Sequence, residues 1–410
     1  MRTLLLFRGA PGCGKSTYIK EHDLEKYTLS ADTIRLMCQG GQETPAGTME
    51  ISPQNDDVVW DMLFKLLEVR MSHGEFTVID ATNSKTVEIN RYKNLAKQYR
   101  YRMYIIDMTD LPIDECKRRN ALRAPLKRVP DAAIDKMYAR FATQKIPSGV
   151  TVLSSDVNVL EKLNYVPQDF NNWNKIHIIG DVHGCYSCLK EYLGDLKDDE
   201  LYIFVGDYLD RGIENVEMFK FLCDVVDNNR KNVILLEGNH ERWLNKWGHD
   251  EPVQSEEFAN YTRPQLFKAG IDHNTARKVY SRVGQCSYFD YDEKRYFVSH
   301  GGLSYLPEFL PFVSTDQMVK GVGRYPDMLT VAESWEKSMP DSYIQIFGHR
   351  NVQDVPIDMG HRCYNLEGKI EFGGYLRCVE LEHGQSIKCV ETKNEMYSEK
   401  RSQRLKLPLK

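Results

Sequence analysis

The segment Leu-Leu-Leu-Phe at residues 4–7 runs almost directly into Gly-Ala-Pro-Gly-Cys-Gly-Lys-Ser at residues 9–16. This is an apolar strand followed by the pattern G-x-x-x-x-G-K-[ST] and a helical stretch at 16–21, which is the context that a phosphate-binding loop requires. A glycine-rich turn before a helix is the simpler alternative, but the strand, the spacing, the lysine and the serine all agree with the loop. The sequence therefore predicts a nucleotide-binding α/β domain.

This loop supplies the contacts that a nucleoside triphosphate needs. Its glycines let successive backbone N–H groups surround phosphate oxygens at the positive end of a helix. Lys15 is expected to reach the β and γ phosphates, and Ser16 is expected to bind Mg²⁺. The predicted ATP-binding residues of the loop are Gly9, Gly12, Cys13, Gly14, Lys15, Ser16 and Thr17.

The hydrophobic pattern of the first half alternates between strands and helices. Residues 78–80 and 104–107 read as buried strands, and residues 58–71 read as an amphipathic helix. This alternation predicts a parallel sheet covered by helices. The sequence becomes polar and Asn-rich around 164–175, which indicates a linker. The predicted divisions are a first domain at 1–160, a linker at 161–175, a second domain at 176–390 and a basic tail at 391–410.

Asp32 and Arg35, which follow the end of the next predicted strand, suggest a binding site for the molecule that accepts the phosphate. Asp32 could accept the proton of an attacking hydroxyl, and Arg35, one helical turn later, could hold a phosphate of the acceptor. An N-cap aspartate with a surface arginine is an equally good interpretation of these two residues alone.

Further along, a basic stretch and a strand end can serve the same nucleotide. Arg119 and Arg123 are expected to share one face of a helix and to clamp a triphosphate, although a solvated basic face is the plainer interpretation. Asp80 closes a strand and could hold a Mg²⁺-bound water or cap a turn.

The second half repeats one design, in which apolar strands at 176–180, 201–206, 233–238, 296–299 and 344–348 run into polar clusters. This predicts a β-sandwich with flanking helices and functional groups at the strand ends. The five clusters are Asp181-Val182-His183-Gly184, Gly206-Asp207-Tyr208-Leu209-Asp210-Arg211-Gly212, Gly238-Asn239-His240-Glu241, His300-Gly301-Gly302 and Gly348-His349-Arg350.

Carboxylate, amide and imidazole groups of this kind suit a pair of divalent cations such as Mn²⁺, Fe or Zn²⁺ that share a bridging carboxylate. His240 lies beside Asn239 and is the best candidate to protonate a leaving oxygen, with Asp210 orienting its ring. Arg211 is expected to grip the phosphate, both as a catalytic and as a substrate-binding residue.

The ordered motifs resemble two known families. Residues 1 to about 150 look like the kinase domain of polynucleotide 5'-kinases, on the phosphate-binding loop, Ser30-Ala31-Asp32 with Arg35, Arg119 with Arg123, and Arg128-Val129-Pro130. That resemblance implies that Asp32 is the general base, that Arg35 binds the acceptor phosphate, and that Arg119 and Arg123 are lid arginines on ATP.

Residues 175–380 resemble the calcineurin-like metallophosphoesterases. The resemblance implies one metal, expected to be Mn²⁺, on Asp181, His183 and Asp207, with Asp207 bridging to a second on Asn239, His300 and His349. Many relatives have the pattern Gly-His-x-His here, whereas in this chain Arg350 follows His349 and the second histidine is missing, so one metal is expected to have one protein ligand fewer. The segment 365–367 stands where many relatives have an Asp-containing segment, and no role is assigned to it.

Together the halves resemble polynucleotide kinase-phosphatases that lack the ligase domain. The implied substrate is a broken RNA, or DNA, with a 5'-OH and a 2',3'-cyclic or 3'-phosphate, healed with ATP, Mg²⁺ and two divalent metals and then sealed by a separate ligase. Two other interpretations stay open. The second half could be a serine/threonine protein phosphatase or a dinucleoside polyphosphate hydrolase with a P-loop regulatory or metabolite-kinase domain, or the P-loop could sense ATP without transferring phosphate.

The composition restricts the class of protein to which this chain can belong. The chain has 410 residues, 41% hydrophobic and 28% charged, with a net charge of −5, so it has no global attraction to a polyanion and must grip nucleic acid locally. No apolar run approaches a membrane span, and the ten cysteines form no paired framework. A cytoplasmic protein without a membrane partner is expected, and a homo-oligomer stays open.

Overall fold

The computed structural model describes residues 2–45 and 47–397. The chain divides into two compact units. The first consists of Met1–Asn164 together with Glu308–Thr315, and the second of Tyr165–Pro307 together with Asp316–Lys410. Each unit has its own sheets and its own core.

The first unit is built on a five-stranded parallel sheet in the order β2-β5-β1-β6-β7. All six residues of the central strand β1 are buried, because both faces of the sheet are covered. The predicted strands at 4–7, 78–80 and 104–107 are therefore confirmed. The strands are β1 (Thr3–Arg8), β2 (Thr28–Ser30), β5 (Thr77–Asp80), β6 (Arg102–Asp107) and β7 (Thr151–Ser154), with a two-stranded hairpin of β3 (Gln42–Glu43) and β4 (Met49–Glu50).

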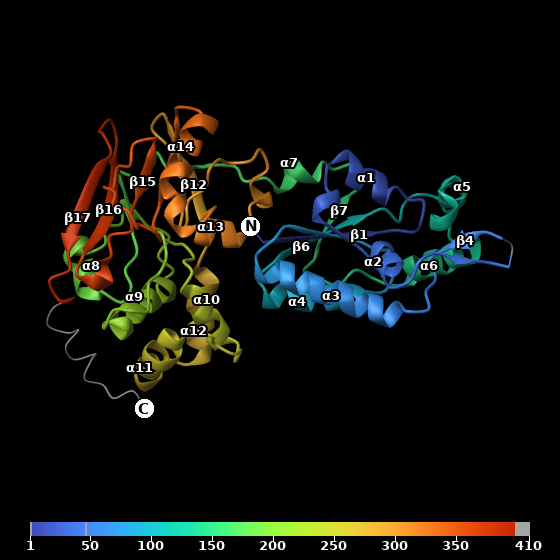
Figure 1. Ribbon diagram of the computed structural model, residues 1–410, viewed down its shortest axis with the longest axis horizontal. Coiled ribbons are helices and arrows are strands. Elements are labelled where there is room, and N and C mark those ends of the chain that lie inside the picture. Colours follow the sequence, from blue (N-terminus) through green and yellow to red (C-terminus); the bar gives the residue numbers. More distant parts are fainter. Residues whose placement is uncertain (1, 46, 398–410) are drawn as a thin grey trace. The chain divides into compact units, whose positions relative to one another are not determined.

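Helices cover both faces of this sheet (Figure 1). One core contains Leu63 and Tyr92 from α3 and α4, and the other contains Tyr18 and Ile134 from α1 and α6. The predicted helix at 58–71 is confirmed as α3. The helices are α1 (Lys15–Glu21), α2 (Ala31–Cys38), α3 (Asp56–Ser72), α4 (Thr86–Gln98), α5 (Ile113–Ala121), α6 (Asp131–Thr143) and α7 (Val159–Leu163).

The segment Glu308–Thr315 belongs to the first unit although it lies far along the chain. Phe312 stacks on Tyr27 at 4.1 Å between ring centroids, and Phe309 packs edge-on against Phe76 at 5.9 Å. The predicted division at 176–390 includes this segment in the second domain. Packing of its two phenylalanines, one buried and one half-buried, against the core of the first unit accounts for its place.

Two five-stranded sheets form the second unit, in the orders β11-β10-β9-β16-β17 and β15-β14-β13-β12-β8. Ile178 and Ile203 from the first sheet meet Val298 and Ile346 from the second in a buried core, which makes a β-sandwich. The strands are β8 (Gln168–Asp169), β9 (Lys175–Ile179), β10 (Glu200–Phe204), β11 (Val233–Leu235), β12 (Cys286–Tyr291), β13 (Lys294–Ser299), β14 (Tyr343–Phe347), β15 (Cys363–Asn365), β16 (Tyr375–Glu382) and β17 (Lys388–Lys393).

Helices flank this sandwich, as predicted. Leu222 of α9 and Trp247 of α10 bury against the outer face of the first sheet, and Trp335 of α14 packs on Phe297 of the second. The helices are α8 (Tyr186–Leu193), α9 (Asn215–Asp227), α10 (Glu241–Gly248), α11 (Arg263–Lys268), α12 (His273–Arg282), α13 (Thr315–Lys320) and α14 (Met328–Ser338).

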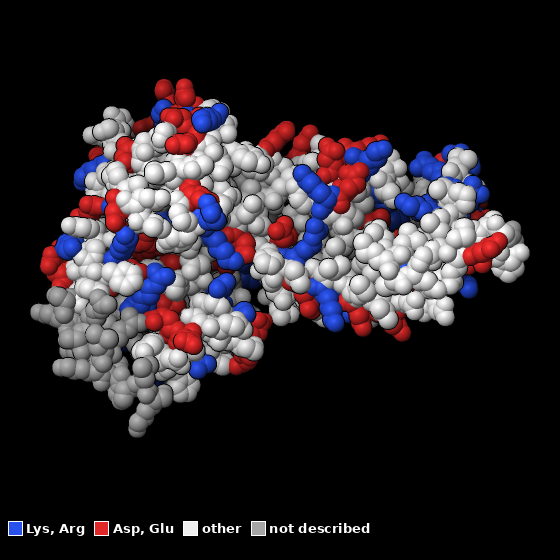
Figure 2. Space-filling view, viewed as in Figure 1, with Lys and Arg blue, Asp and Glu red and all other residues white. Residues whose placement is uncertain are grey.

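The structure also bears on the predicted basic tail and on the distribution of charge over the surface. Residues 391–393 of the predicted basic tail are part of β17, and Lys400, Arg401, Arg404, Lys406 and Lys410 lie outside the described residues. On the drawn face, Lys and Arg side chains gather over α5 and are elsewhere interspersed with Asp and Glu (Figure 2). Among the described residues, every helix is too short or too polar to cross a membrane.

Candidate active sites

The phosphate-binding loop lies between the carboxyl end of β1 and the start of α1, as its sequence predicts. Gly12 has a φ of 87°, and a Cβ there would come within 2.3 Å of the carbonyl oxygen of Cys116, so a side chain is excluded on both counts. Lys15 Nζ donates to the carbonyl oxygens of Gly9 at 2.8 Å and Ala10 at 3.0 Å. The lysine is thus held against the loop that it is expected to serve.

An open cavity of about 900 Å³ lies in front of this loop. Of the predicted ATP-binding loop residues, Gly9 and Cys13 do not line it; Cys13 faces the core, with its Sγ 4.0 Å from the sulfur of Met108. The predicted residues that line the cavity are Gly12, Gly14, Lys15, Ser16, Thr17, Asp32, Arg35, Asp80, Arg119 and Arg123.

Asp32 and Arg35 lie on α2, directly after β2, at the wall of the same cavity. The side chain of Ser30, not that of Asp32, caps the helix, by accepting from the N–H of Thr33. Arg35 donates through Nη1 to Asp32 and through Nε to Asp56, both at 2.7 Å. The N-cap alternative for Asp32 is therefore wrong, and its carboxylate faces an arginine within the cavity.

The basic residues of the cavity do not share a helix face as predicted. The helix α5 ends at Ala121, so Arg119 is helical, whereas Arg123 follows the end of the helix. Arg119 Nε donates to Glu115 Oε1 at 2.6 Å, which orients it along α5. The cavity also takes in Lys127, which sequence reasoning missed. Its basic residues are Lys15, Arg35, Arg119, Arg123, Lys127 and Arg128, against the acidic Asp32, Glu50 and Asp80.

Asp80 ends β5, next to the strand that carries the phosphate-binding loop. Burial raises the pKa of its carboxyl group, and the nearby Lys15 ammonium opposes that shift. Asp80 and Lys15 therefore interact electrostatically, and both line the cavity.

In the second unit, the predicted metal ligands gather from both sheets at the carboxyl ends of the strands. Asp207 Oδ2 lies 3.5 Å from His183 Nε2 and 3.3 Å from His300 Nε2. Asn239 Oδ1 lies 3.2 Å from His300 Nε2, and the backbone N–H of His349 lies 3.2 Å from Asp181 Oδ2. The carboxylate of Asp207 is between the two histidines, where a bridging ligand would be.

Several of these residues have left-handed backbone conformations, which are uncommon outside glycine and cluster at functional sites. Such φ angles turn a side chain sharply away from the strand that precedes it. The site residues concerned are His183 (φ 44°), Asp207 (φ 51°), Asp210 (φ 73°), Arg211 (φ 64°) and His349 (φ 68°).

The chemistry of this donor set fits divalent cations. Burial lowers the pKa of His183 to about 4 and that of His349 to about 3, so both imidazoles are neutral and can donate a lone pair. Burial, with the neighbouring carboxylates of Glu367 and Asp207, raises the pKa of Asp181. Buried carboxylates this close together need positive charge beside them, which bound cations supply.

One member of this cluster was not assigned a role from sequence. Asp181, His183 and Glu367 can offer ligand atoms that lie within 4.8 Å of one another. Glu367 follows β15 and is 3% exposed. Glu367, to which no role was assigned from the sequence, is therefore a further candidate ligand beside Asp181 and His183.

Arg350, which directly follows the predicted ligand His349, has a structural role. It is fully buried, and its guanidinium donates to the carbonyl oxygens of Val322 and Arg324, both at 2.9 Å. These bonds hold the turn before α14 against the loop that carries His349.

The ring of the proposed proton donor is positioned by one carboxylate, that of Asp210. His240 Nδ1 lies 2.6 Å from Asp210 Oδ2, and Thr262 donates to the other oxygen of Asp210. Burial lowers the pKa of His240, but Asp207 and Asp210 outweigh it and raise the value overall. The ring is therefore fixed through Nδ1, which leaves Nε2 for the reaction.

Glu241 joins the loops that carry these groups, a role that sequence reasoning missed. Its carboxylate accepts from the backbone N–H groups of Asp207 at 2.9 Å, Tyr208 at 3.0 Å and Gly238 at 2.7 Å. Burial and the nearby Asp207 raise the pKa of Glu241 to about 7. Glu241 therefore holds the loop that contains Asp207 and Tyr208 against the loop that contains Gly238.

Comparison with known proteins finds a matching domain family in each unit. Residues 4–144 match the family described as AAA domain, and residues 174–378 match the family described as calcineurin-like phosphoesterase. A bis(5'-nucleosyl)-tetraphosphatase (asymmetrical) of Geobacillus thermodenitrificans is 30% identical over 227 residues, 50% of this chain and 89% of that protein.

Two protein phosphatases, one from the curated proteins and one from the solved structures, also match part of the chain. Serine/threonine-protein phosphatase 2 of Salmonella typhimurium is 36% identical over 85 residues, 20% of this chain and 36% of that protein. A solved protein serine/threonine phosphatase from Saccharomyces cerevisiae covers 57% of this chain and 85% of its own, with 14% identity and a TM-score of 0.39.

The first unit thus has a phosphate-binding loop within a segment that matches the AAA domain family, and the second combines a β-sandwich with a histidine and carboxylate cluster at its strand ends. With the match over residues 174–378, the chain belongs to the calcineurin-like phosphoesterase family.

Proposed function

We propose that this protein repairs broken nucleic-acid ends and that it prefers RNA to DNA. The first unit would phosphorylate a 5'-hydroxyl with ATP, and the second would open a 2',3'-cyclic phosphate and remove the resulting monoester. The observation that carries the proposal is the 900 Å³ cavity, in which the phosphate-binding loop and the Asp32–Arg35 pair line one space. A nucleotide sensor needs the loop alone, whereas a kinase needs both.

The kinase reaction follows from the residues around that cavity. The acceptor O5' attacks the γ-phosphorus while the bond to the β–γ bridging oxygen breaks, and the proton of the hydroxyl passes to Asp32 Oδ. Arg35, held by Asp32 and Asp56, is placed to bind a phosphate of the acceptor strand. Arg119, Arg123 and Lys15 balance the charge of the triphosphate.

In the second unit, the residues of the chain orient the ester and supply a proton. When bound, divalent cations polarise a phosphate and lower the pKa of water. Arg211 grips phosphate oxygens beside His183, since its Nη1 lies 3.1 Å from His183 Nε2. His240 Nε2 donates a proton to the leaving oxygen, and Asp210 keeps Nδ1 in place.

The pairing of these two reactions favours RNA ends. Cleavage of RNA by transesterification leaves a 5'-hydroxyl and a 2',3'-cyclic phosphate, so one chain with both activities restores ends that a separate ligase can join. A dinucleoside polyphosphate hydrolase is the second candidate, because the relative that is 30% identical is a bis(5'-nucleosyl)-tetraphosphatase. That candidate gives no reason for the Asp32–Arg35 pair.

RNA carrying a 5'-hydroxyl and a 2',3'-cyclic phosphate tests the proposal directly. With ATP, Mg²⁺ and Mn²⁺, we expect the wild-type protein to change both ends. Lys15→Ala should reduce only 5' phosphorylation and His183→Ala only the 3' reaction, each about a hundredfold or more. Resolution of both ends on a denaturing gel measures this. Faster hydrolysis of diadenosine tetraphosphate or of a phosphopeptide than of the RNA 3' end would reject the repair function.

Substitution of Asp32 separates a kinase from a sensor. We expect Asp32→Asn to lower the rate of 5' phosphorylation about 10² to 10⁴-fold, because a general base contributes that much. Affinity for ATP, measured by calorimetry, should stay close to that of wild type. The matched control is Asp57→Asn, at an exposed aspartate of α3. An unchanged phosphorylation rate in Asp32→Asn would remove Asp32 from the mechanism.

The role of His240 can be tested by comparing substrates whose leaving groups differ in basicity. A proton donor matters most when the leaving oxygen is basic, so His240→Ala should slow hydrolysis of a 3'-nucleotide about 10² to 10⁴-fold. Hydrolysis of p-nitrophenyl phosphate should slow much less, because its leaving group, p-nitrophenolate, is already a stable anion. Steady-state kcat values on the two substrates give the comparison. Equal losses on both would show that His240 acts in some other way.

A further inference from the structure

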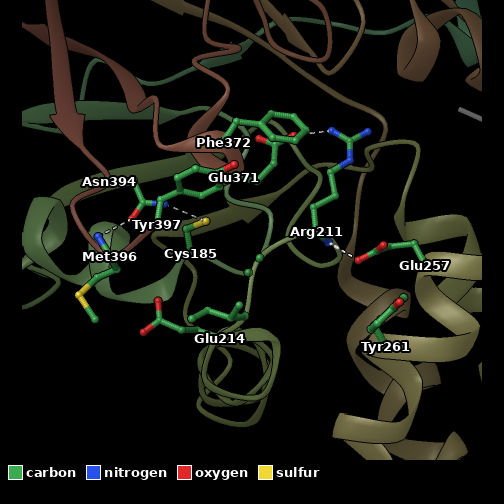
Figure 3. A pocket seen from close by; sticks show the side chains of 13 residues that line it. Cys185, Arg211, Glu214, Glu257, Tyr261, Glu371, Phe372, Asn394, Met396 and Tyr397 are labelled. Carbon is green, nitrogen blue, oxygen red and sulfur yellow. Dashed lines mark hydrogen bonds and ion pairs between the residues drawn. The ribbon is translucent and has the colours of Figure 1, made fainter. Parts of the chain in front are cut away.

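A second cavity, of about 390 Å³, lies beside the metal-ligand cluster of the second unit. Gly184, which follows His183, and Arg211 both line it. Figure 3 shows Arg211 and Phe372 on one side, Glu257 and Tyr261 on another, and Asn394 and Tyr397 facing them across the cavity. None of these residues except Arg211 was singled out by the sequence.

The polar groups of the cavity indicate a ligand that donates hydrogen bonds. Three carboxylates line it, which disfavours a second anionic group. Glu214 accepts from Ser187, and Glu257 accepts from the backbone N–H of Arg211, so both already hold local structure. Glu371 accepts from Arg211 Nη1 through Oε1 at 2.7 Å, and its Oε2 is buried without a hydrogen-bond partner in the described part of the chain.

An unsatisfied buried carboxylate oxygen is costly, and a donor on a ligand can satisfy it. The side chain of Glu371 is 2% exposed, so water is largely kept from it. Because Glu371 lines the cavity, an amino group of a bound ligand is a donor that could satisfy this oxygen.

The apolar part of the cavity suits a flat ring. Phe372, at the end of a 3₁₀ turn spanning Ile370–Phe372, is 59% exposed, although it is large and apolar. Tyr261 and Tyr397 also line the cavity. The exposed ring of Phe372, beside a phosphate-binding arginine, is a platform on which a nucleobase can stack.

The position of Arg211 connects this cavity to the reaction. Its Nη1 lies 2.7 Å from Glu371 Oε1 and 3.1 Å from His183 Nε2, so one guanidinium borders both places. A phosphate gripped there would direct the nucleoside attached to it into the cavity. The volume is within the range of roughly 300 to 1,000 Å³ of small-molecule sites, which suits one nucleoside better than an extended peptide.

We infer that this cavity binds the base of the nucleoside whose phosphate is hydrolysed at the adjacent cluster. The base stacks on Phe372, and its exocyclic amino group donates to Glu371. The inference rests on the proposed function, since it names the group that carries the scissile phosphate. Adenine, guanine and cytosine have such an amino group, whereas uracil has none.

The test compares substrates on the full chain loaded with Mn²⁺. We expect 2',3'-cyclic AMP to be hydrolysed with a KM several-fold below that of 2',3'-cyclic UMP. Phe372→Ala should lower the ratio of kcat/KM for 2',3'-cyclic AMP to kcat/KM for p-nitrophenyl phosphate about tenfold, mainly through KM. Phe372→Tyr, which keeps the ring, should restore the ratio.

The matched control is Phe267→Ala, at a phenylalanine of α11 that is 73% exposed and outside the cavity, and it should keep the wild-type ratio. Should Phe372→Ala fail to fold, the comparison of the two cyclic nucleotides on wild-type protein still decides. Hydrolysis of both with equal KM, or a ratio unchanged in Phe372→Ala, overturns the inference and leaves the proposed function standing. Hydrolysis of a phosphopeptide but of neither cyclic nucleotide overturns both.

Discussion

The second unit depends on one electrostatic constraint, the burial of three carboxylates around His183. Asp181, Asp207 and Glu367 are each at most 3% exposed, and Asp181 and Glu367 share a group with His183. Left alone, these charges repel one another and lose their hydration. Neutral imidazoles and bound cations offset that cost, so the features that build the cluster, including strained backbone and the bonds of Glu241, serve to collect metal ligands.

Much of this arrangement could be predicted from the sequence, because each strand that carries a ligand is a short apolar run that ends in a polar cluster. The strands before Asp181, Asp207 and Asn239, and the one before the phosphate-binding loop, were recognisable by that pattern alone. Parallel strands bring their carboxyl ends to one edge, which is why residues far apart in sequence could be grouped correctly.

Other features depend on contacts that no local pattern records. Glu367 joins the cluster through the pairing of β14 with β15, and Arg350 is explained only by the carbonyl groups that it reaches. Residues 308–315 pack with the first unit through two phenylalanines that look like any loop residues in sequence. The cavity beside Arg211 is assembled from five separate segments, so its aromatic and acidic lining becomes visible only in the folded chain.

The most direct test of this account is the number of divalent cations that the chain holds. After loading with Mn²⁺ and removal of free metal, elemental analysis of wild-type protein should give two ions per chain in the second unit. Asp207→Asn should lose at least one, while Asp195→Asn, at a fully exposed aspartate of the same unit, should keep both. A wild-type chain that retains no ion, or an ion content that Asp207→Asn leaves unchanged, would contradict the account.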